Sequence, residues 1–256
     1  MIEKRTEPYT SEFYQNKKTE TRISAEAVVS LIRDWVTPTS VIDLGCGIGE
    51  WLAVFNEAGV QEISGVDGCW VPQDQLLIPR HAFTEHDLTI SYIAQRRYDL
   101  AISLETAEHL PLASSQSLVG SLTDLAPIVL FSAAIPDQAG ANHINCQWPS
   151  YWANLFAQCS YKFIDALRPR IWEDSRVAWW YRQNLMMYVH EEELKRRPNL
   201  AAFHHCQSEK PLPLVHPEML REILEWGLGE NRKYLELYLE REQTMRCMTK
   251  KDPAIW

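Results

Sequence analysis

A glycine-rich turn between an expected strand and an expected helix places the strongest constraint on the fold. The segment VIDLGCGIGE (41–50) begins as a short apolar run and ends in closely spaced glycines, after which Trp51, Leu52 and Phe55 follow at helical spacing. Glycines in a turn let the backbone approach a ligand closely and donate its N–H groups. A strand, a glycine turn and a helix in this order predict a βαβ unit and a mostly parallel sheet.

The rest of the chain repeats this alternation. SAEAVVSLIRDWV (24–36) predicts a first helix with Ser24 as its N-cap. Strands are expected at 40–45, 62–67, 82–87, 98–105, 127–136, 161–167 and 179–189, and further helices at 49–59, 114–125 and 149–159. No helix is evident between the last two strands, which favours an antiparallel hairpin. We predict an α/β fold: a doubly wound, mostly parallel, Rossmann-like sheet with an antiparallel edge and a C-terminal helical extension.

Three segments are expected along the chain. Residues 1–23 form an N-terminal arm, residues 24–189 the α/β domain and residues 190–256 the C-terminal extension. Helical patterns at 217–226 and 229–247 carry apolar residues that either cover the sheet or mediate self-association into a homo-oligomer.

Cysteine usage and hydropathy predict the compartment. The six cysteines form no CxxC pair, and no window approaches the ~18–20 continuous apolar residues of a membrane span. The opening segment MIEKRTEPYTSEF is too polar for a secretory signal. We therefore expect a cytoplasmic protein with reduced thiols and no membrane span.

The charge balance argues against long nucleic acid as a partner. The chain carries 25 basic and 34 acidic residues, and residues 23–190 alone hold nine basic against eighteen acidic residues. A surface that neutralises many phosphates needs the opposite sign.

Asp67 ends the strand that follows the glycine turn, twenty residues after Gly47. At this place a carboxylate accepts hydrogen bonds from the ribose hydroxyls of a nucleotide-like cofactor. The glycine spacing is GxGxG, whereas pyrophosphate binders carry GxGxxG.

With Asp43 two residues before the first glycine, this spacing resembles the class I methyltransferases, which use S-adenosylmethionine (SAM). The resemblance covers roughly residues 24–189 and implies a SAM-dependent methyltransferase. It implies that the methionine end of SAM binds to Asp43 and to Gly45, Gly47 and Gly49. Asp67 would bind the ribose, and Asp87 and the backbone N–H of Leu88 would bind the adenine.

A second motif follows the fourth expected strand. Glu105, Glu108 and His109 lie within one turn, where two carboxylates and an imidazole could bind a divalent ion, and His143 after the fifth strand is a candidate fourth ligand. The ExxEH spacing resembles two metal-assisted families, the ubiquinone-pathway catechol O-methyltransferases and the small-RNA terminal 2′-O-methyltransferases. The chain lacks their flanking signatures.

These patterns together predict SAM-dependent O-methylation of a small-molecule or glycan hydroxyl. FYQNKKTETRISAEAV and HINCQWPSYW resemble bacterial methyltransferases found among polysaccharide-modifying enzymes, and Trp148 and Tyr151 are expected to face the acceptor. A divalent metal that binds neighbouring oxygens would lower the pKa of the attacking hydroxyl. In the alternative, His109 or His143 is a metal-free general base. A non-catalytic SAM-binding scaffold and an NAD-dependent oxidoreductase also stay open, while the acidic domain opposes an RNA ribose methyltransferase.

Overall fold

The computed structural model describes the backbone of residues 11–227 and the side chains of residues 20–225. The chain divides into two compact units, the first ending at Leu214 and the second beginning at Val215. The described residues of the second unit include helix α9 (Pro217–Gly227), which confirms the helix expected at 217–226. The helix expected at 229–247 lies outside the described residues.

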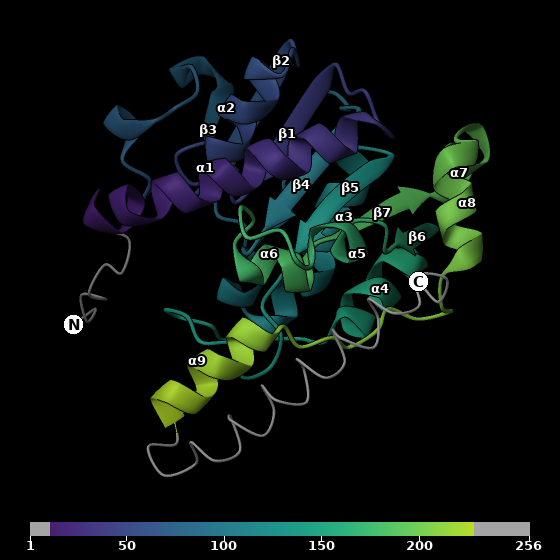
Figure 1. Ribbon diagram of the computed structural model, residues 1–256. Coiled ribbons are helices and arrows are strands. Elements are labelled where there is room, and N and C mark those ends of the chain that lie inside the picture. The colour runs from purple at the N-terminus through teal and green to yellow at the C-terminus, as the bar shows by residue number, and fades with distance from the viewer. Residues whose placement is uncertain (1–10, 228–256) are drawn as a thin grey trace. The chain divides into compact units, whose positions relative to one another are not determined.

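A seven-stranded sheet forms the centre of the first unit within the described residues (Figure 1). The strand order is β3-β2-β1-β4-β5-β7-β6, with β1 to β5 parallel and β7 antiparallel to both β5 and β6. This confirms the mostly parallel sheet with an antiparallel edge. The strands are β1 (Ser40–Leu44), β2 (Glu62–Asp67), β3 (Phe83–Glu85), β4 (Leu100–Leu104), β5 (Ile128–Ser132), β6 (Tyr161–Ile164) and β7 (Met186–His190).

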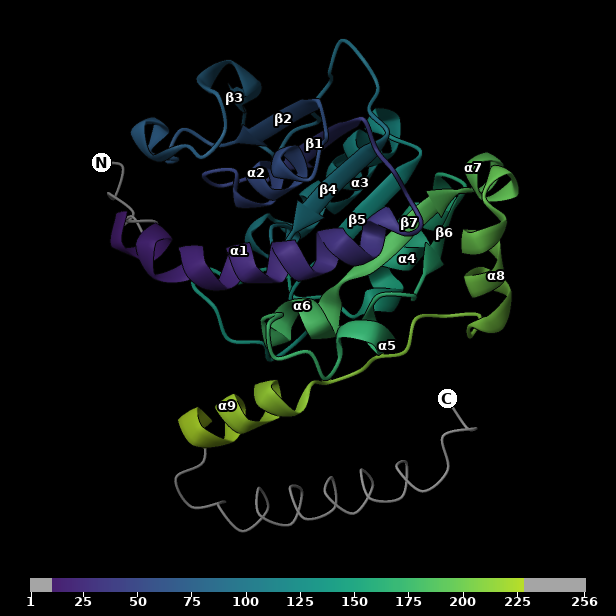
Figure 2. The ribbon, with the colours of Figure 1, turned by 45° about the horizontal axis from the view of Figure 1, so that its top comes forward.

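Helices cover both faces of this sheet. Apolar residues of α1, α2, α6 and α8 belong to one core cluster, and those of α3 and α4 to a second. In β4, Leu100 and Ile102 belong to the first cluster and Ala101 belongs to the second, because successive side chains of a strand point to opposite faces of the sheet. Figure 2 shows α1 lying across the first face. The helices are α1 (Ser11–Arg33), α2 (Glu50–Glu57), α3 (Ser115–Leu125), α4 (Pro149–Gln158), α5 (Arg168–Ile171), α6 (Trp179–Asn184), α7 (Glu191–Arg196) and α8 (Pro198–Cys206).

The expected helix start at Ser24 is wrong. Helix α1 begins at Ser11 and passes without interruption through residue 23. Ser24 is fully buried inside it: its Oγ donates to the Glu20 carbonyl oxygen at 2.7 Å and accepts from the Ala178 N–H at 2.9 Å. A serine that bonds to the carbonyl four residues earlier is compatible with a helix interior, and here it also ties α1 to the start of α6.

The strand expected at 179–189 is half wrong. Trp179–Asn184 forms helix α6, and only Met186–His190 forms β7. Strands β6 and β7 pair in antiparallel orientation as expected, but α5 and α6 lie between them in the chain, so they are not a hairpin. Because five of the six residues of α6 are buried, its sequence shows no apolar period that separates a helix from a strand.

The parallel strands set the position of the candidate site. The carboxyl ends of β1, β2, β4 and β5 meet at one edge of the sheet, where ligands bind in folds of this class. Among the described residues, no helix is both long enough and apolar enough to cross a membrane.

Candidate active site

The glycine turn after β1 lies directly against the turn after β4. Gly45 has a φ of +92°, and a Cβ at this position would lie 2.2 Å from Thr106 Oγ1. Thr106 Oγ1 donates to the Gly45 carbonyl oxygen at 3.5 Å. Only glycine combines this backbone conformation with so close an approach. The glycine turn and the ExxEH turn, sixty residues apart in the chain, are therefore in contact.

Asp67, at the end of β2, holds the glycine turn from its other side. Its Oδ2 accepts from the Gly47 N–H at 2.7 Å, and its Oδ1 accepts from the Gly68 N–H at 2.6 Å. Burial raises the pKa of Asp67, and these two N–H groups oppose the rise. The carboxylate thus orders the loop that the sequence assigns to the cofactor.

Asp43 lies one strand away with an unsatisfied oxygen. It is 3% exposed in the middle of the sheet, and its Oδ1 has no hydrogen-bond partner among the described residues. Burial, and then the neighbouring charge of Asp67, raise the pKa of Asp43 well above its ordinary value. Leaving a buried acceptor unpaired is unfavourable, and a cationic ligand would relieve the cost.

The segment after β3 lies beside Asp67. The His86 N–H donates to the Asp67 carbonyl oxygen at 2.8 Å. Asp87 follows with an exposed carboxylate whose Oδ1 accepts from the Thr89 N–H at 2.9 Å, and this contact lowers the pKa of Asp87. The Leu88 side chain is buried in the core. Asp67 therefore ends β2 and Asp87 follows the adjacent strand β3 at the same sheet edge.

Glu108, His109 and His143 come together after β4. One potential ligand atom from each residue lies within 4.8 Å of the others, and the two imidazole rings are 4.9 Å apart, edge to face. Glu108 is fully buried, and neither of its carboxylate oxygens has a hydrogen-bond partner among the described residues. Burial, and then the charge of Glu105, raise the pKa of Glu108 well above its ordinary value. The donor set fits a divalent metal such as Mn²⁺, Fe²⁺ or Zn²⁺.

Backbone hydrogen bonds carry His143 to this place. The N–H groups of Ile144 and Asn145 both donate to the Glu108 carbonyl oxygen, at 2.8 and 3.1 Å. The buried Asn145 amide donates in turn to the Ala107 carbonyl oxygen at 3.3 Å and to Ser115 Oγ at 3.0 Å. The loop after β5 is thereby fastened to the ExxEH turn.

The ring of His143 has a defined tautomer. Its Nδ1 lies 3.0 Å from the Gln138 carbonyl oxygen. Because a carbonyl oxygen only accepts, Nδ1 carries the hydrogen, and in the neutral ring Nε2 holds the lone pair. This is the form in which a histidine ligates a metal or takes a proton.

Glu105 lies outside the group of three. Its Oε2 accepts from Gln138 Nε2 at 3.0 Å, and its Oε1 accepts from Asn184 Nδ2 at 3.1 Å. Glu105 also has a φ of +51°, in the left-handed region, and its N–H donates to the Ser132 carbonyl oxygen at 3.0 Å. The carboxylate is thus held by amide donors beside Glu108. That Glu105 also ligates a metal stays a prediction.

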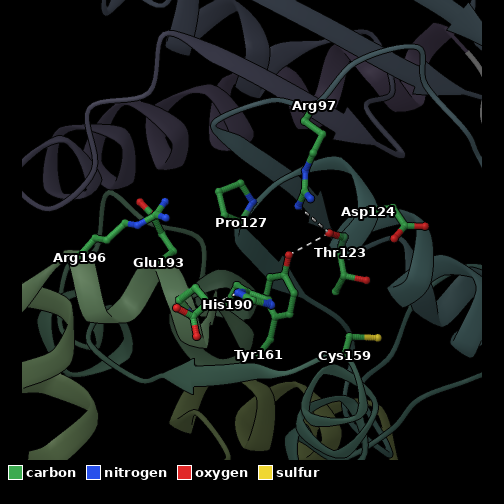
Figure 3. A pocket seen from close by; sticks show the side chains of 10 residues that line it. Arg97, Thr123, Asp124, Pro127, Cys159, Tyr161, His190, Glu193 and Arg196 are labelled. Carbon is green, nitrogen blue, oxygen red and sulfur yellow. Dashed lines mark hydrogen bonds and ion pairs between the residues drawn. The ribbon is translucent and has the colours of Figure 1, made fainter.

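A separate cavity of about 510 Å³ lies away from this edge. Figure 3 shows Arg97 and Tyr161 pointing toward Thr123, whose carbonyl oxygen accepts from both, at 3.2 and 2.9 Å. The lining includes Pro127, just before β5, and His190, the end of β7. These are at the opposite end of the strands from the glycine turn, so the cavity is not part of the candidate active site.

Sequence reasoning missed the residues that support this site. Thr106, Gln138, Asn145 and Asn184 hold the glycine turn, Glu105 or the His143 loop. For Thr106 the signal was its place inside the ExxEH motif. The three amide residues stand at no motif spacing, and Asn184 falls in a segment that was expected to be a strand.

Comparisons with known proteins give the same fold. Residues 16–197 match the methyltransferase domain family, and no curated protein matches the chain. Among solved structures, the sugar N-methyltransferase KedS8 from Streptoalloteichus is 14% identical with a TM-score of 0.55, over 74% of this chain and 98% of its own. An O-methyltransferase family protein from Burkholderia thailandensis is 14% identical with a TM-score of 0.54, over 70% of this chain and 58% of its own. Magnesium protoporphyrin IX methyltransferase from Synechocystis with bound SAM is 16% identical with a TM-score of 0.50, over 72% of this chain and 86% of its own.

Proposed function

The chain belongs to the methyltransferase domain family, and from that premise we propose that it transfers a methyl group from SAM to an oxygen of a small-molecule or glycan acceptor with the help of a divalent metal. The observation that carries the proposal is the meeting of Glu108, His109 and His143 beside the glycine turn. In this reaction the acceptor oxygen bonds to the methyl carbon, the carbon–sulfur bond breaks toward sulfur, and the acceptor proton leaves.

Features of the sheet edge support SAM as the donor. The unpartnered Oδ1 of Asp43 would accept from the SAM ammonium group, and Gly45, Gly47 and Gly49 all have positive φ, which suits a tight glycine turn at the proposed place of the methionine end. Asp67 accepts from two backbone N–H groups and from the Trp70 side chain, and because a carboxylate has about four acceptor sites, capacity remains for a ribose hydroxyl.

Asp87 and the Leu88 N–H stay the proposed adenine contacts. The solved structure of the Synechocystis enzyme contains SAM, and that enzyme shares this fold. This supports SAM as the methyl donor.

The metal proposal is based on the carboxylate of Glu108. A buried carboxylate whose two oxygens have no hydrogen-bond partner among the described residues is costly unless a proton or a cation neutralises it, and a metal would displace the proton. His143 is held in the tautomer that a metal site requires. A divalent ion bound here would lower the pKa of an acceptor hydroxyl and orient two neighbouring oxygens, as in a sugar diol. Glu108, His109 and His143 would hold the ion, with Glu105 as the proposed further ligand.

Three exposed apolar residues that lie close in the chain to His109 or His143 support an acceptor with a ring-shaped body. Ile144 is 63% exposed, and its N–H donates to the Glu108 carbonyl oxygen. Leu112 and Trp148 are also exposed, at 55% and 38%. The half-buried Tyr151 ring contacts Trp152, 5.0 Å away and edge to face, and its contact with the acceptor stays a prediction. An exposed tryptophan beside polar ligands suits the apolar face of a sugar or aromatic acceptor.

The contact between the two histidine rings favours a second candidate mechanism. His143, with its Nδ1 hydrogen bonded to a carbonyl, could accept the acceptor's proton through Nε2 without a metal, and His109 lies 4.9 Å away. A chelator should abolish methyl transfer that depends on a metal and should leave transfer by base catalysis unchanged. A chelator added to the methyl-transfer assay therefore separates the two mechanisms.

Isothermal calorimetry with Mg²⁺, Mn²⁺, Fe²⁺ and Zn²⁺ tests the metal. We expect the wild type to bind at least one ion at one site and Glu108→Gln to lose at least tenfold in affinity. Glu191→Gln is the matched control, because Glu191 pairs with Lys162 at the opposite sheet edge. Equal binding heats for wild type and Glu108→Gln would leave only the metal-free mechanism.

Thermal shift with SAM and with NAD tests the donor. A ligand that binds the folded state raises the melting temperature, so SAM is expected to raise it and NAD is not. The opposite result would favour the oxidoreductase. SAM binding without methyl transfer to any of a panel of sugars and catechols would favour the scaffold.

A further inference from the structure

We propose that Gln138 is a positioning residue of the acceptor site: its side chain holds Glu105 while its backbone carbonyl holds His143. The inference rests on the proposed function of these residues. Gln138 lies in the turn after β5 and is 6% exposed. Its Nε2 donates to Glu105 Oε2 at 3.0 Å, and its carbonyl oxygen accepts from His143 Nδ1 at 3.0 Å. One residue therefore touches both sides of the site.

The orientation of the Gln138 amide is fixed by its surroundings. Its Oε1 accepts from the Ile135 N–H at 3.3 Å, from Gln183 Nε2 at 3.1 Å and from Asn184 Nδ2 at 2.9 Å. With three donors around the oxygen, the amide nitrogen must face Glu105. Gln183 and Asn184 are 1% and 5% exposed, so water does not substitute for these contacts.

The same network restrains Glu105 at both oxygens. Asn184 Nδ2 donates to Glu105 Oε1 at 3.1 Å while Gln138 donates to Oε2. Asn184 ends α6, and Gln138 follows β5, so the position of Glu105 depends on how α6 packs against the sheet. A half-buried carboxylate held at both oxygens in this way has one orientation relative to Glu108, which is the property a ligand or an acceptor contact requires.

The second contact of Gln138 restrains the His143 ring. A Cβ at Gly140 would lie 2.1 Å from His143 Nε2, so the ring packs directly on the Gly140 backbone. Two hydrogen bonds between Gln138 and Ile135 anchor the turn whose carbonyl receives Nδ1–H: the Gln138 N–H donates to the Ile135 carbonyl oxygen at 3.1 Å, and the Ile135 N–H donates to the Gln138 side chain at 3.3 Å. Loss of the side chain is therefore expected to release the carbonyl as well as Glu105.

The test compares Gln138→Leu with Gln207→Leu. Gln207 is a matched control, because its amide donates to the Phe163 carbonyl oxygen and accepts from the Asp165 N–H, at 2.6 and 2.9 Å, and touches no site residue. Calorimetry with Mn²⁺ alone and with SAM alone measures the two affinities. Spectra of protein with ¹⁵N-labelled histidine, assigned with His143→Asn, report the tautomer of His143 at pH 8.

We expect Gln138→Leu to lose at least tenfold in Mn²⁺ affinity and to give a mixture of His143 tautomers, with SAM affinity within twofold of wild type. Gln207→Leu should retain both signals. If Gln138→Leu binds SAM and keeps the wild-type His143 spectrum and Mn²⁺ affinity, Gln138 only packs, and the inference is wrong.

Two further outcomes are separable. If the wild type binds no Mn²⁺, the metal part of the proposed function fails, and the His143 spectrum alone decides the role of Gln138. Should Gln138→Leu not fold, Gln138→Met replaces it, because the unbranched thioether has nearly the length of glutamine and lacks both the donor to Glu105 and the acceptor for the Ile135 N–H. An unchanged His143 spectrum in that variant overturns the inference, and an altered tautomer ratio supports it.

Discussion

Replacing Asp43 by Asn should make the cofactor-free protein less sensitive to rising pH while weakening SAM binding. Burial and the charge of Asp67 raise the pKa of Asp43 above 3.8, so between the unfolded and folded pKa values the native state binds more protons than the unfolded state. Across that window the free energy of unfolding of the wild type falls by ~1.4 kcal/mol per pH unit because of Asp43. Asn does not titrate, so the variant lacks this loss.

The size of the effect follows from the burial of this side chain. Asp43 is 3% exposed, and its Oδ1 is unpaired among the described residues. A buried unpaired acceptor costs about 1–3 kcal/mol, and for a domain of this size 1 kcal/mol corresponds to roughly 2–4 °C in melting temperature. The melting temperature of Asp43→Asn minus that of the wild type should therefore rise by about 2–12 °C between pH 4.5 and 8. The unpaired amide hydrogens of Asn cancel in this comparison, because they do not titrate.

The assay is a thermal melt at several pH values, with and without SAM. Loss of a charge-assisted hydrogen bond of about 1.5–3 kcal/mol predicts ~10–150-fold weaker SAM binding by Asp43→Asn. Asp99→Asn is the control, because the contribution of Asp99 to stability depends on pH with the opposite sign. Burial acts to raise the pKa of Asp99, but hydrogen bonds from Thr39 and Ser40 outweigh it and lower the pKa, so the stability they give is present above pH 3.8 and lost below the folded pKa. Parallel stability curves for Asp43→Asn and wild type, or equal SAM affinities, would refute the assignment.

Three further substitutions follow from the same geometry. Gly45→Ala should lower the free energy of unfolding by about 1–3 kcal/mol, because φ is +92° and the new Cβ would collide with Thr106. Adding Thr106→Ala to this variant should restore part of the lost free energy, and denaturant melts of both variants would measure it. Gly140→Ala should weaken Mn²⁺ binding but not SAM binding, since its Cβ would displace the His143 ring, and unchanged Mn²⁺ calorimetry would contradict this. Ser24→Ala should lower the melting temperature by roughly 2–8 °C, the effect of about 1–2 kcal/mol from losing its hydrogen bonds to Glu20 and Ala178; a change below 1 °C would show that they contribute little.

The strands of the sheet were predicted correctly where the local sequence pattern fits only one kind of secondary structure. The buried run before Gly45 and the run that ends at Asp67 could only be short strands, and both formed where expected. Trp179–Asn184 gave no such signal, because a short helix that is mostly buried and a buried strand look alike in sequence. Ser24 failed for a different reason: an N-cap and a back-bonded serine inside a helix are the same residue type in the same place.

The candidate site likewise contains residues that a sequence rule predicts and residues that no such rule predicts. His143 was predicted as a partner of Glu108 although 34 residues separate them, because the carboxyl ends of adjacent parallel strands meet. The amide network around Glu105 had no comparable rule. It depends on the end of α6 meeting the turn after β5, a tertiary contact that no local pattern encodes.

The contact between Gly45 and Thr106 has a consequence for catalysis. Methyl transfer requires the methyl carbon and the attacking oxygen about 3–3.5 Å apart and in line. The glycine turn would hold the donor and the ExxEH turn the acceptor, and they are joined by the pairing of β1 with β4 and by Thr106 lying against Gly45. The distance between donor and acceptor is therefore set by two adjacent strands in the centre of the sheet, which are among the least deformable elements of such a fold. Variants that loosen this contact, such as Thr106→Ala, should retain SAM affinity and lose turnover, and a variant with the reverse pattern would show that the turns act separately.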